Sequence, residues 1–313
     1  MARKLRGCFA GRLVEVTTRT FQSRFLLRPG TLANRTILGV LARAQQRTGM
    51  QVVGPVAMSN HMHLLLLPET TKQLRDFMRY VNSNVARKVG RLYGWKGRFW
   101  EKRYSAIIVS NEEEAQVGRL RYLLSQGVKD GLVERPEDWP GLHLARPLQL
   151  GYSSLSGGVW HDRTAQYRAE RRVGARRVRA ADFIEKNLVL ELSPLPCWRD
   201  LSWSERRDAS RSLIDDVVLE AQHESGERTV LGAEAVKRHD PLAAPQKSDR
   251  RYAPPCHAAS LKARKELLRE LRSFADSFLV ASEALRNGMT ACFPEGCFPP
   301  GMPYVAESTV PDG

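Results

Sequence analysis

The chain has 313 residues, 42% of them hydrophobic, and a formal net charge of +15 at pH 7. A chain of this length can bury a sizeable core and is expected to form two domains. No segment approaches the roughly 18 consecutive apolar residues that a membrane span requires, which excludes a membrane-spanning protein and indicates a soluble one.

Hydrophobic periodicity predicts alternating strands and helices in the first half. In chain order we expect a strand within Gly11–Thr20, a helix at Thr31–Gly49, strands at Gln51–Met58 and His61–Leu67, a helix at Thr71–Tyr93, a strand at Ala106–Val109 and a helix at Glu112–Gln126. This order predicts an α+β domain at residues 1–145, with a ferredoxin-like antiparallel sheet and helices on one face.

The second half has a different composition. We assign residues 146–313 to a C-terminal extension that is mainly helical and contains Pro-rich linkers. Helices are expected at Ser204–Ser225 and Leu261–Arg286, with an arginine-dense segment at Thr164–Ala181 and a polar linker at His239–Pro255. The arginine-dense segment could equally form a solvated helix face.

The positive charge is concentrated in the first half. Residues 1–150 hold 25 Lys and Arg against 11 Asp and Glu, an excess of 14, whereas the remainder holds 24 against 23. A domain with such an excess attracts polyanions, because each neutralised phosphate releases counterions. Nucleic acid is therefore a better expectation than a basic surface without a partner.

The cysteines give little functional information. The five are scattered, odd in number and without a C-x-x-C pair, which favours reduced thiols over a disulfide framework. Cys256-His257 could be half of a zinc site, but no second pair stands at ligand spacing, so a structural role is favoured.

Two histidines stand one residue apart at the start of an apolar run. Side chains alternate along a strand, so His61 and His63 leave the same face. Two neutral imidazoles on one face can hold a divalent metal, and a metal beside a basic surface suggests chemistry on phosphates. Taken alone, the pair is better explained by side chains that cap a sheet edge.

A tyrosine in the last predicted helix of the domain is the candidate nucleophile. Tyr122 and Gln126 are one turn apart, and Arg119 and Arg121 flank the phenol. Arginines in such positions can bind phosphates and favour the phenolate, and a tyrosine hydroxyl can act as a covalent nucleophile. A packed core or interface aromatic is the alternative interpretation.

Four ordered blocks carry a resemblance to a known family. They are Met1–Arg6, Met58–Leu65, Gly97–Ile107 and Arg121–Leu123 with Gly131–Pro140. Together they resemble the single-tyrosine HUH transposases of the IS200-like superfamily, and among these the REP-associated tyrosine transposases that are often encoded beside palindromic repeats. The resemblance covers about residues 1–142.

The resemblance implies a role for each matching residue. It makes His61 and His63 metal ligands, Gln126 the polar residue that completes the metal site, and Tyr122 the nucleophile. The metal would be Mg²⁺ or Mn²⁺, and the substrate single-stranded DNA that contains a hairpin or palindromic repeat. Where the family often has Asn-Pro this chain has Gln126-Gly127, and Ser59 replaces the usual Pro before Asn-His; a Gln carbonyl still suits a hard cation.

The implied reaction is attack of Tyr122 on a phosphate, giving a 5′-phosphotyrosine and a free 3′-hydroxyl, and its reversal rejoins a strand. Candidate contacts to the DNA backbone are Arg98, Lys102, Arg103, Arg119 and Arg121, with Phe99, Trp100 and Tyr104 available to stack on bases. Such a protein is expected at the nucleoid. The sequence leaves the oligomeric state open, with a homodimer as one option.

Two rival functions fit the same residues. In a metal-dependent nuclease, His61 and His63 would activate water and Tyr122 would be structural. In a domesticated DNA-binding repressor, the basic face would remain without catalysis. A covalent protein–DNA adduct distinguishes the transposase from both.

Overall fold

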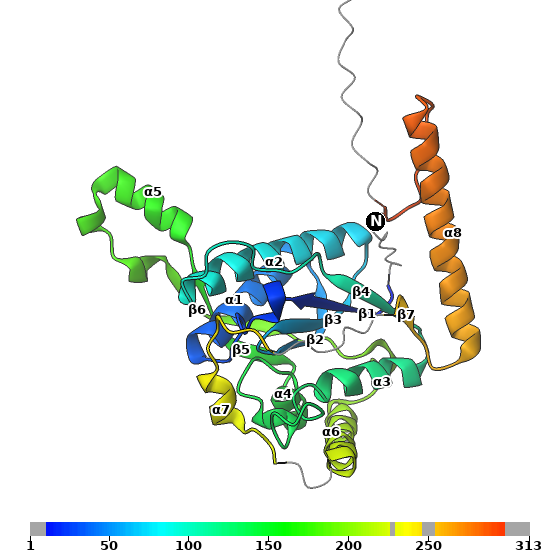
Figure 1. Ribbon diagram of the computed structural model, residues 1–313, viewed down its shortest axis with the longest axis horizontal. Coiled ribbons are helices and arrows are strands. Elements are labelled where there is room, and N and C mark those ends of the chain that lie inside the picture. The colour runs from blue at the N-terminus through cyan, green and yellow to red at the C-terminus, as the bar shows by residue number, and fades with distance from the viewer. Residues whose placement is uncertain (1–10, 226–228, 246–253, 298–313) are drawn as a thin grey trace, which may run out of the picture.

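The computed structural model describes residues 11–225, 229–245 and 254–297 (Figure 1). Its main elements are β1 (Val14–Arg19), α1 (Thr31–Thr48), β2 (Gln51–Ala57), β3 (His61–Leu67), α2 (Thr71–Leu92), β4 (Ser105–Val109), α3 (Glu113–Leu124), α4 (Ala145–Leu150), β5 (Ser154–His161), α5 (Arg163–Val173), β6 (Ile184–Glu191), α6 (Trp203–Ser225), α7 (Ala233–Arg238), β7 (Cys256–His257) and α8 (Leu261–Arg286). The Met1–Arg6 block and Cys8 lie outside the described residues. Across the described part of the chain, no helix is both long enough and apolar enough to cross a membrane.

Five strands form the main sheet in the order β2-β3-β1-β4-β7. The first four run antiparallel to their neighbours and follow the β-α-β-β-α-β order of a ferredoxin-like unit. Local sequence sets the helix ends: Gly49 ends α1 in the left-handed conformation, and the Thr70 side chain accepts a hydrogen bond from Gln73 N at the start of α2. The predicted α+β class is confirmed.

The register of β1 and β3 divides the sheet into two faces. Val14 pairs with Leu66, and three residues further along β1 Thr17 pairs with His63. Because side chains alternate, Val14 and Leu66 point to one face, while Glu15 and His63 point to the other.

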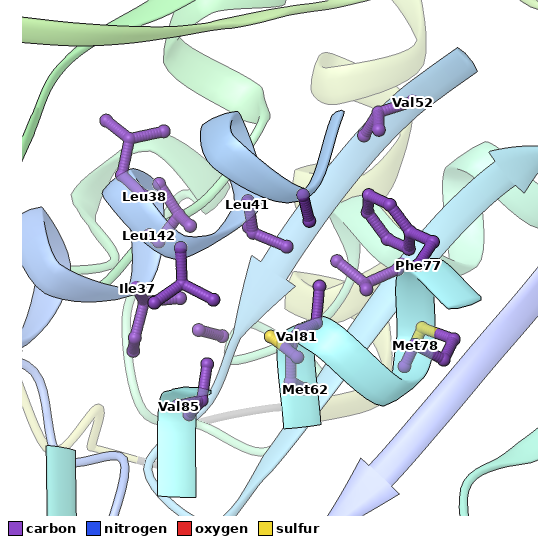
Figure 2. Packing of buried hydrophobic residues seen from close by; sticks show 14 of the residues in the cluster. Ile37, Leu38, Leu41, Val52, Met62, Phe77, Met78, Val81, Val85 and Leu142 are labelled. Carbon is purple, nitrogen blue, oxygen red and sulfur yellow. The ribbon is translucent and has the colours of Figure 1, made fainter. Parts of the chain in front are cut away.

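The first face packs against α1 and α2. Ile37 and Leu41 of α1 meet Phe77 and Val81 of α2 above Met62 of β3 (Figure 2). All of these side chains are buried. They form the apolar stripe that the 3.6-residue period predicts for both helices.

The second face is also covered. Val53, Leu65 and Val109 of the sheet share a core with Leu120 of α3 and Ile214 of α6. The expectation of helices on one face therefore holds for α1 and α2 only. The second layer was missed because α6 belongs to the C-terminal extension, whose packing partners the sequence pattern does not identify.

The extension begins with helix α4 and then a β-hairpin, β5–β6, that the expectation of a mainly helical segment omitted. Leu188 and Leu190 of β6 belong to the first core. Gly39 of α1 lies so close to the backbone of Val159 in β5 that no side chain would fit at position 39. The hairpin therefore packs closely on α1. The arginine-rich α5, which connects the two strands, projects from the body of the protein (Figure 1).

Trp160 of β5 fixes the hairpin to the two helices of the first layer. Its ring stacks on Tyr80 with centroids 5.9 Å apart, Lys88 Nζ lies 3.7 Å from the ring centroid, and Arg43 Cζ lies 4.8 Å from it. Burial lowers the pKa of Lys88 to about 8, and its ammonium donates to the carbonyl of His161 at 2.6 Å. These cation–π contacts hold β5 at a defined position on α1 and α2.

The Cys256-His257 pair has a structural position. It forms β7, which runs parallel to β4 with Cys256 beside Ile108 and His257 beside Val109. Cys256 is buried in a small apolar cluster with Ile108 and Leu267 of α8.

Truncation of a buried side chain in β3 should destabilise the fold far more than truncation of an exposed side chain in α8. Leu66→Ala should lower the free energy of unfolding by about 2–5 kcal/mol, because it leaves a cavity in the first core. Leu261→Ala is the matched control, since Leu261 is 73% exposed; its effect should stay below about 0.5 kcal/mol. Urea unfolding followed by circular dichroism measures both, and equal losses would contradict the placement of Leu66.

Candidate functional site

The two histidines lie at the first and third positions of β3, on the face covered by α3. Their rings are edge to face with centroids 4.8 Å apart. His63 is buried and His61 is partly exposed. Burial, together with the nearby charges of His63, Arg19 and Lys129, holds the pKa of His61 well below its usual value, and this favours the neutral imidazole that a metal requires.

Hydrogen bonds to the Nδ1 atoms orient both rings. His63 Nδ1 lies 2.6 Å from Glu15 Oε1, and His61 Nδ1 lies 2.7 Å from Asn60 Oδ1. A carboxylate only accepts hydrogen bonds, so Nδ1 of His63 carries a proton, and in the neutral imidazole Nε2 then holds the lone pair. His63 Nε2 is buried without a hydrogen-bond partner in the described structure. This is the arrangement of metal-binding histidines that are oriented by a second group.

Glu15 is the functional residue that the sequence analysis missed. It is fully buried in β1 and accepts hydrogen bonds from His63 and from the Arg119 guanidinium. Burial alone would raise the pKa of Glu15, but the hydrogen bond from His63 and the charges of His63 and Arg119 outweigh burial, and the pKa lies below its usual value. The available signal was a carboxylate between Val14 and Val16, in a strand whose other charged residue, Arg19, stands at its end.

Tyr122 faces the histidines from the last turn of α3. Its ring centroid lies 5.8 Å from that of His63, in an edge-to-face arrangement, and the side chain is 36% exposed. Arg119 Cζ lies 4.4 Å and Lys129 Nζ 4.0 Å from the ring centroid. The phenol is therefore open to solvent and flanked by two cations, of which Lys129 was not anticipated.

Gln126 lies two residues beyond the end of α3, not within the helix as the sequence suggested. Its side chain is buried, and Nε2 donates to the carbonyl of Tyr122 at 2.7 Å. A side-chain hydrogen bond with Gln126 also acts on His61, raising its pKa against the stronger effect of burial. The structure thus brings together His61, His63, Tyr122 and Gln126.

The donor atoms suit an open metal site. Two imidazole nitrogens and one amide oxygen would leave further positions for water or phosphate oxygens. The described part of the chain contains no group of three or more His, Cys, Asp and Glu placed to hold a metal. Any metal here therefore needs Gln126 or the substrate to complete its coordination.

The five arginines and lysines predicted to contact DNA fall into two groups. Arg98, Lys102 and Arg103 are exposed. Arg119 is buried in its ion pair with Glu15, and this contradicts its expected place on an open DNA-binding surface. Arg121 is bound by carboxylates of α6.

The contacts of Arg121 tie α3 to the C-terminal extension. Its guanidinium lies 2.9 Å from Glu220 Oε1 and 3.6 Å from Asp216 Oδ2. Both carboxylates come from α6, a helix whose partner could not be read from the sequence. The expected phosphate-binding role of Arg121 thus competes with two acids in its own chain.

The three aromatic residues predicted to stack on bases differ in how far they are exposed. Phe99 is buried and packs in the first core, so it is not available to bases. Trp100 and Tyr104 are partly buried, and Trp100 Nε1 donates to the carbonyl of Asn82 at 2.8 Å.

One family model matches the segment that carries the site. Residues 22–126 match the family model described as "Transposase IS200 like", a segment that includes His61, His63, Tyr122 and Gln126. No curated protein matches.

Two solved structures are similar to parts of the chain. One is a REP-associated tyrosine transposase bound to a REP hairpin, with 18% identity over 46% of this chain and 82% of that chain and a TM-score of 0.39. The other is a protein from Deinococcus radiodurans R1 assigned as a transposase, with 21% identity over 38% of this chain and 95% of that chain and a TM-score of 0.28.

Removing the buried carboxylate should destabilise the protein. Glu15→Ala leaves Arg119 as a buried charge without its partner, and the free energy of unfolding should fall by about 3–5 kcal/mol. Glu270→Ala, which removes a half-exposed partner of Arg12, should cost less than about 1 kcal/mol. Urea unfolding compares the two variants, and similar losses would show that the ion pair of Glu15 is not a structural requirement.

Proposed function

Residues 22–126 match the IS200-like transposase family model, and from this match we propose that the protein cleaves and rejoins single-stranded DNA through a covalent bond between Tyr122 and a 5′-phosphate. The observation that carries the proposal is the exposed phenol of Tyr122 beside His63, whose buried Nε2 has no hydrogen-bond partner in the described structure. A nucleophile and a candidate phosphate-activating group thus face one another.

The metal is part of the proposal. His61, His63 and Gln126 would hold Mg²⁺ or Mn²⁺, which would polarise the scissile phosphate and stabilise the charge that develops on its oxygens. Glu15 keeps His63 in the tautomer whose Nε2 can bind a metal. In the described structure, Asn60 has the same role for His61.

The proposed reaction is a transesterification. The Tyr122 oxygen forms a bond to phosphorus and loses its proton to solvent, while the bond from phosphorus to the 3′-oxygen breaks and that oxygen takes up a proton. Lys129, whose ammonium lies 4.0 Å from the ring centroid of Tyr122, would offset the negative charge of the phosphate that the phenol attacks. Attack by another 3′-hydroxyl reverses the step, so no external energy source is needed.

We propose that Tyr122 acts on the metal site of its own chain. His63 and Tyr122 meet within one chain, and α6 of the same chain holds α3 through the ion pairs of Arg121 with Asp216 and Glu220. A homodimer is then not needed to complete the site. The proposed substrate is hairpin-forming single-stranded DNA, on the strength of the sequence blocks, and such a substrate would place the protein at the nucleoid in the cytoplasm.

The covalent adduct tests the reaction. Wild-type protein incubated with Mn²⁺ and a labelled single-stranded hairpin oligonucleotide should give a labelled band that survives denaturing electrophoresis, and Tyr122→Phe should give none because the nucleophile is removed. Tyr152→Phe is the control, since Tyr152 is also an exposed tyrosine, and it should behave as wild type.

The other outcomes identify the rival functions. Cleavage without an adduct would indicate hydrolysis by a metal-dependent nuclease. Binding without cleavage would indicate a DNA-binding repressor.

Metal binding can be measured without activity. His63→Ala should lower the affinity for Mn²⁺ by at least about 10-fold in calorimetry, because it removes a proposed nitrogen ligand, and Glu15→Gln should lower it by about 10- to 100-fold by releasing the ring of His63. His223→Ala is the control, because His223 is an exposed histidine near the end of α6. Unchanged Mn²⁺ affinity in His63→Ala would remove this histidine from the metal site.

A further inference from the structure

A basic hollow of about 600 Å³ lies where α2 ends and the chain returns to the sheet. We call it the basic hollow and define it by six of its lining residues, Arg87, Arg91, Trp95, Lys96, Arg98 and Trp100. Its volume is within the range of small-ligand sites, about 300–1,000 Å³. Four cations and two indole rings therefore surround one space.

The aromatic walls are held in place before any ligand binds. Trp95 Nε1 donates to the carbonyl of Arg98 at 3.2 Å, and Trp100 Nε1 donates to the carbonyl of Asn82 at 2.8 Å. Phe99 lies between them in sequence and is buried in the first core. Both indoles are only partly buried, so each keeps surface against which a flat ring can stack.

The cations have no carboxylate partners among the described residues. The ion pairs of this part of the chain involve none of Arg87, Arg91, Lys96 and Arg98. The C-terminal carbonyls of α2 do not need these cations either. Gly90 O accepts from Trp95 N at 2.8 Å, and Arg91 O accepts from Gly94 N at 3.2 Å. Four like charges around one hollow repel each other, and an anionic ligand would relieve that repulsion.

Strand register places the hollow at the histidine end of the sheet. Thr20, which follows β1, forms a bridge with Trp100 and donates its N–H to the carbonyl of Asn60 at 2.9 Å. Asn60 is the residue before His61 and hydrogen-bonds its ring. One extended backbone therefore connects the wall of the hollow to the proposed metal site.

We propose that the basic hollow binds one nucleotide of the single-stranded DNA that Tyr122 cleaves, with the base against Trp95 and the phosphates between Arg91, Lys96 and Arg98. This inference rests on the proposed function. An anionic, flat-ringed ligand matches both the charge and the aromatic walls, and stacking on an indole accepts any base. The hollow thus fixes the path of the strand on one side of the scissile phosphate.

Photo-crosslinking tests the position of the base. The full chain is mixed in EDTA with a single-stranded oligonucleotide in which 5-iododeoxyuridine replaces each thymidine in turn, irradiated, and mapped by mass spectrometry. We expect a crosslink to Trp95 from one position. Trp95→Ala should bind the oligonucleotide about 5- to 100-fold more weakly by fluorescence anisotropy, and Trp95→Phe should retain most of the affinity because it keeps a stacking ring.

Charge is tested with a matched pair of double variants. Arg91→Ala/Lys96→Ala should reduce the slope of log affinity against log salt by up to about 1.4, as two phosphate contacts are lost. Arg264→Ala/Lys265→Ala removes the same charge from exposed positions on α8 and should leave the slope unchanged. Circular dichroism confirms that each variant is folded.

The outcomes separate this proposal from the proposed function. If the wild type forms the Tyr122 adduct but Trp95→Ala and Arg91→Ala/Lys96→Ala bind DNA as the wild type does, the hollow is not a nucleotide site and the transposase chemistry stands. If Trp95 crosslinks but no adduct forms with Mn²⁺, the hollow binds DNA and the cleavage chemistry fails. Crosslinks confined to other surfaces would overturn the position proposed for the strand.

Discussion

The buried carboxylate of Glu15 is the constraint on which the site depends. A buried charge in β1, away from water, must be paired and hydrogen-bonded. Its two partners, His63 and Arg119, come from β3 and α3. One residue therefore joins the central strand pair to the helix that carries Tyr122, and structural integrity and the chemistry of the site share the same interaction.

This arrangement explains why the second face of the sheet is both a core and a site. At the Leu65 end, apolar residues of the sheet pack under α3 and α6, whereas at the His61 end the same face carries polar side chains. Alternation along β3 supplies both the apolar and the polar part of this face, because His61, His63 and Leu65 follow one another at intervals of two residues. The apolar part holds α3 in place, and Tyr122 on its last turn then lies over the polar part.

Patterns with a short period could be predicted from the sequence, and pairings between distant residues could not. The shared face of His61 and His63 followed from strand alternation, and α8 follows its apolar period over the predicted range. Arg119 was expected to bind DNA because nothing near it in sequence indicates its pairing with Glu15. The β5–β6 hairpin was missed because the arginine-rich insertion separates its strands, and Gln126 lies beyond α3 because helix ends are poorly fixed by periodicity.

Strand β7 has a consequence for how the chain tolerates change. It contributes only Cys256 and His257, yet it covers the edge of β4, whose backbone groups would otherwise be open to another chain. The segment that protects the sheet of the first half thus lies more than a hundred residues away in the second half. Protection of the β4 edge is in this sense a property of the whole chain, because an isolated first half would leave the backbone groups of β4 unpaired.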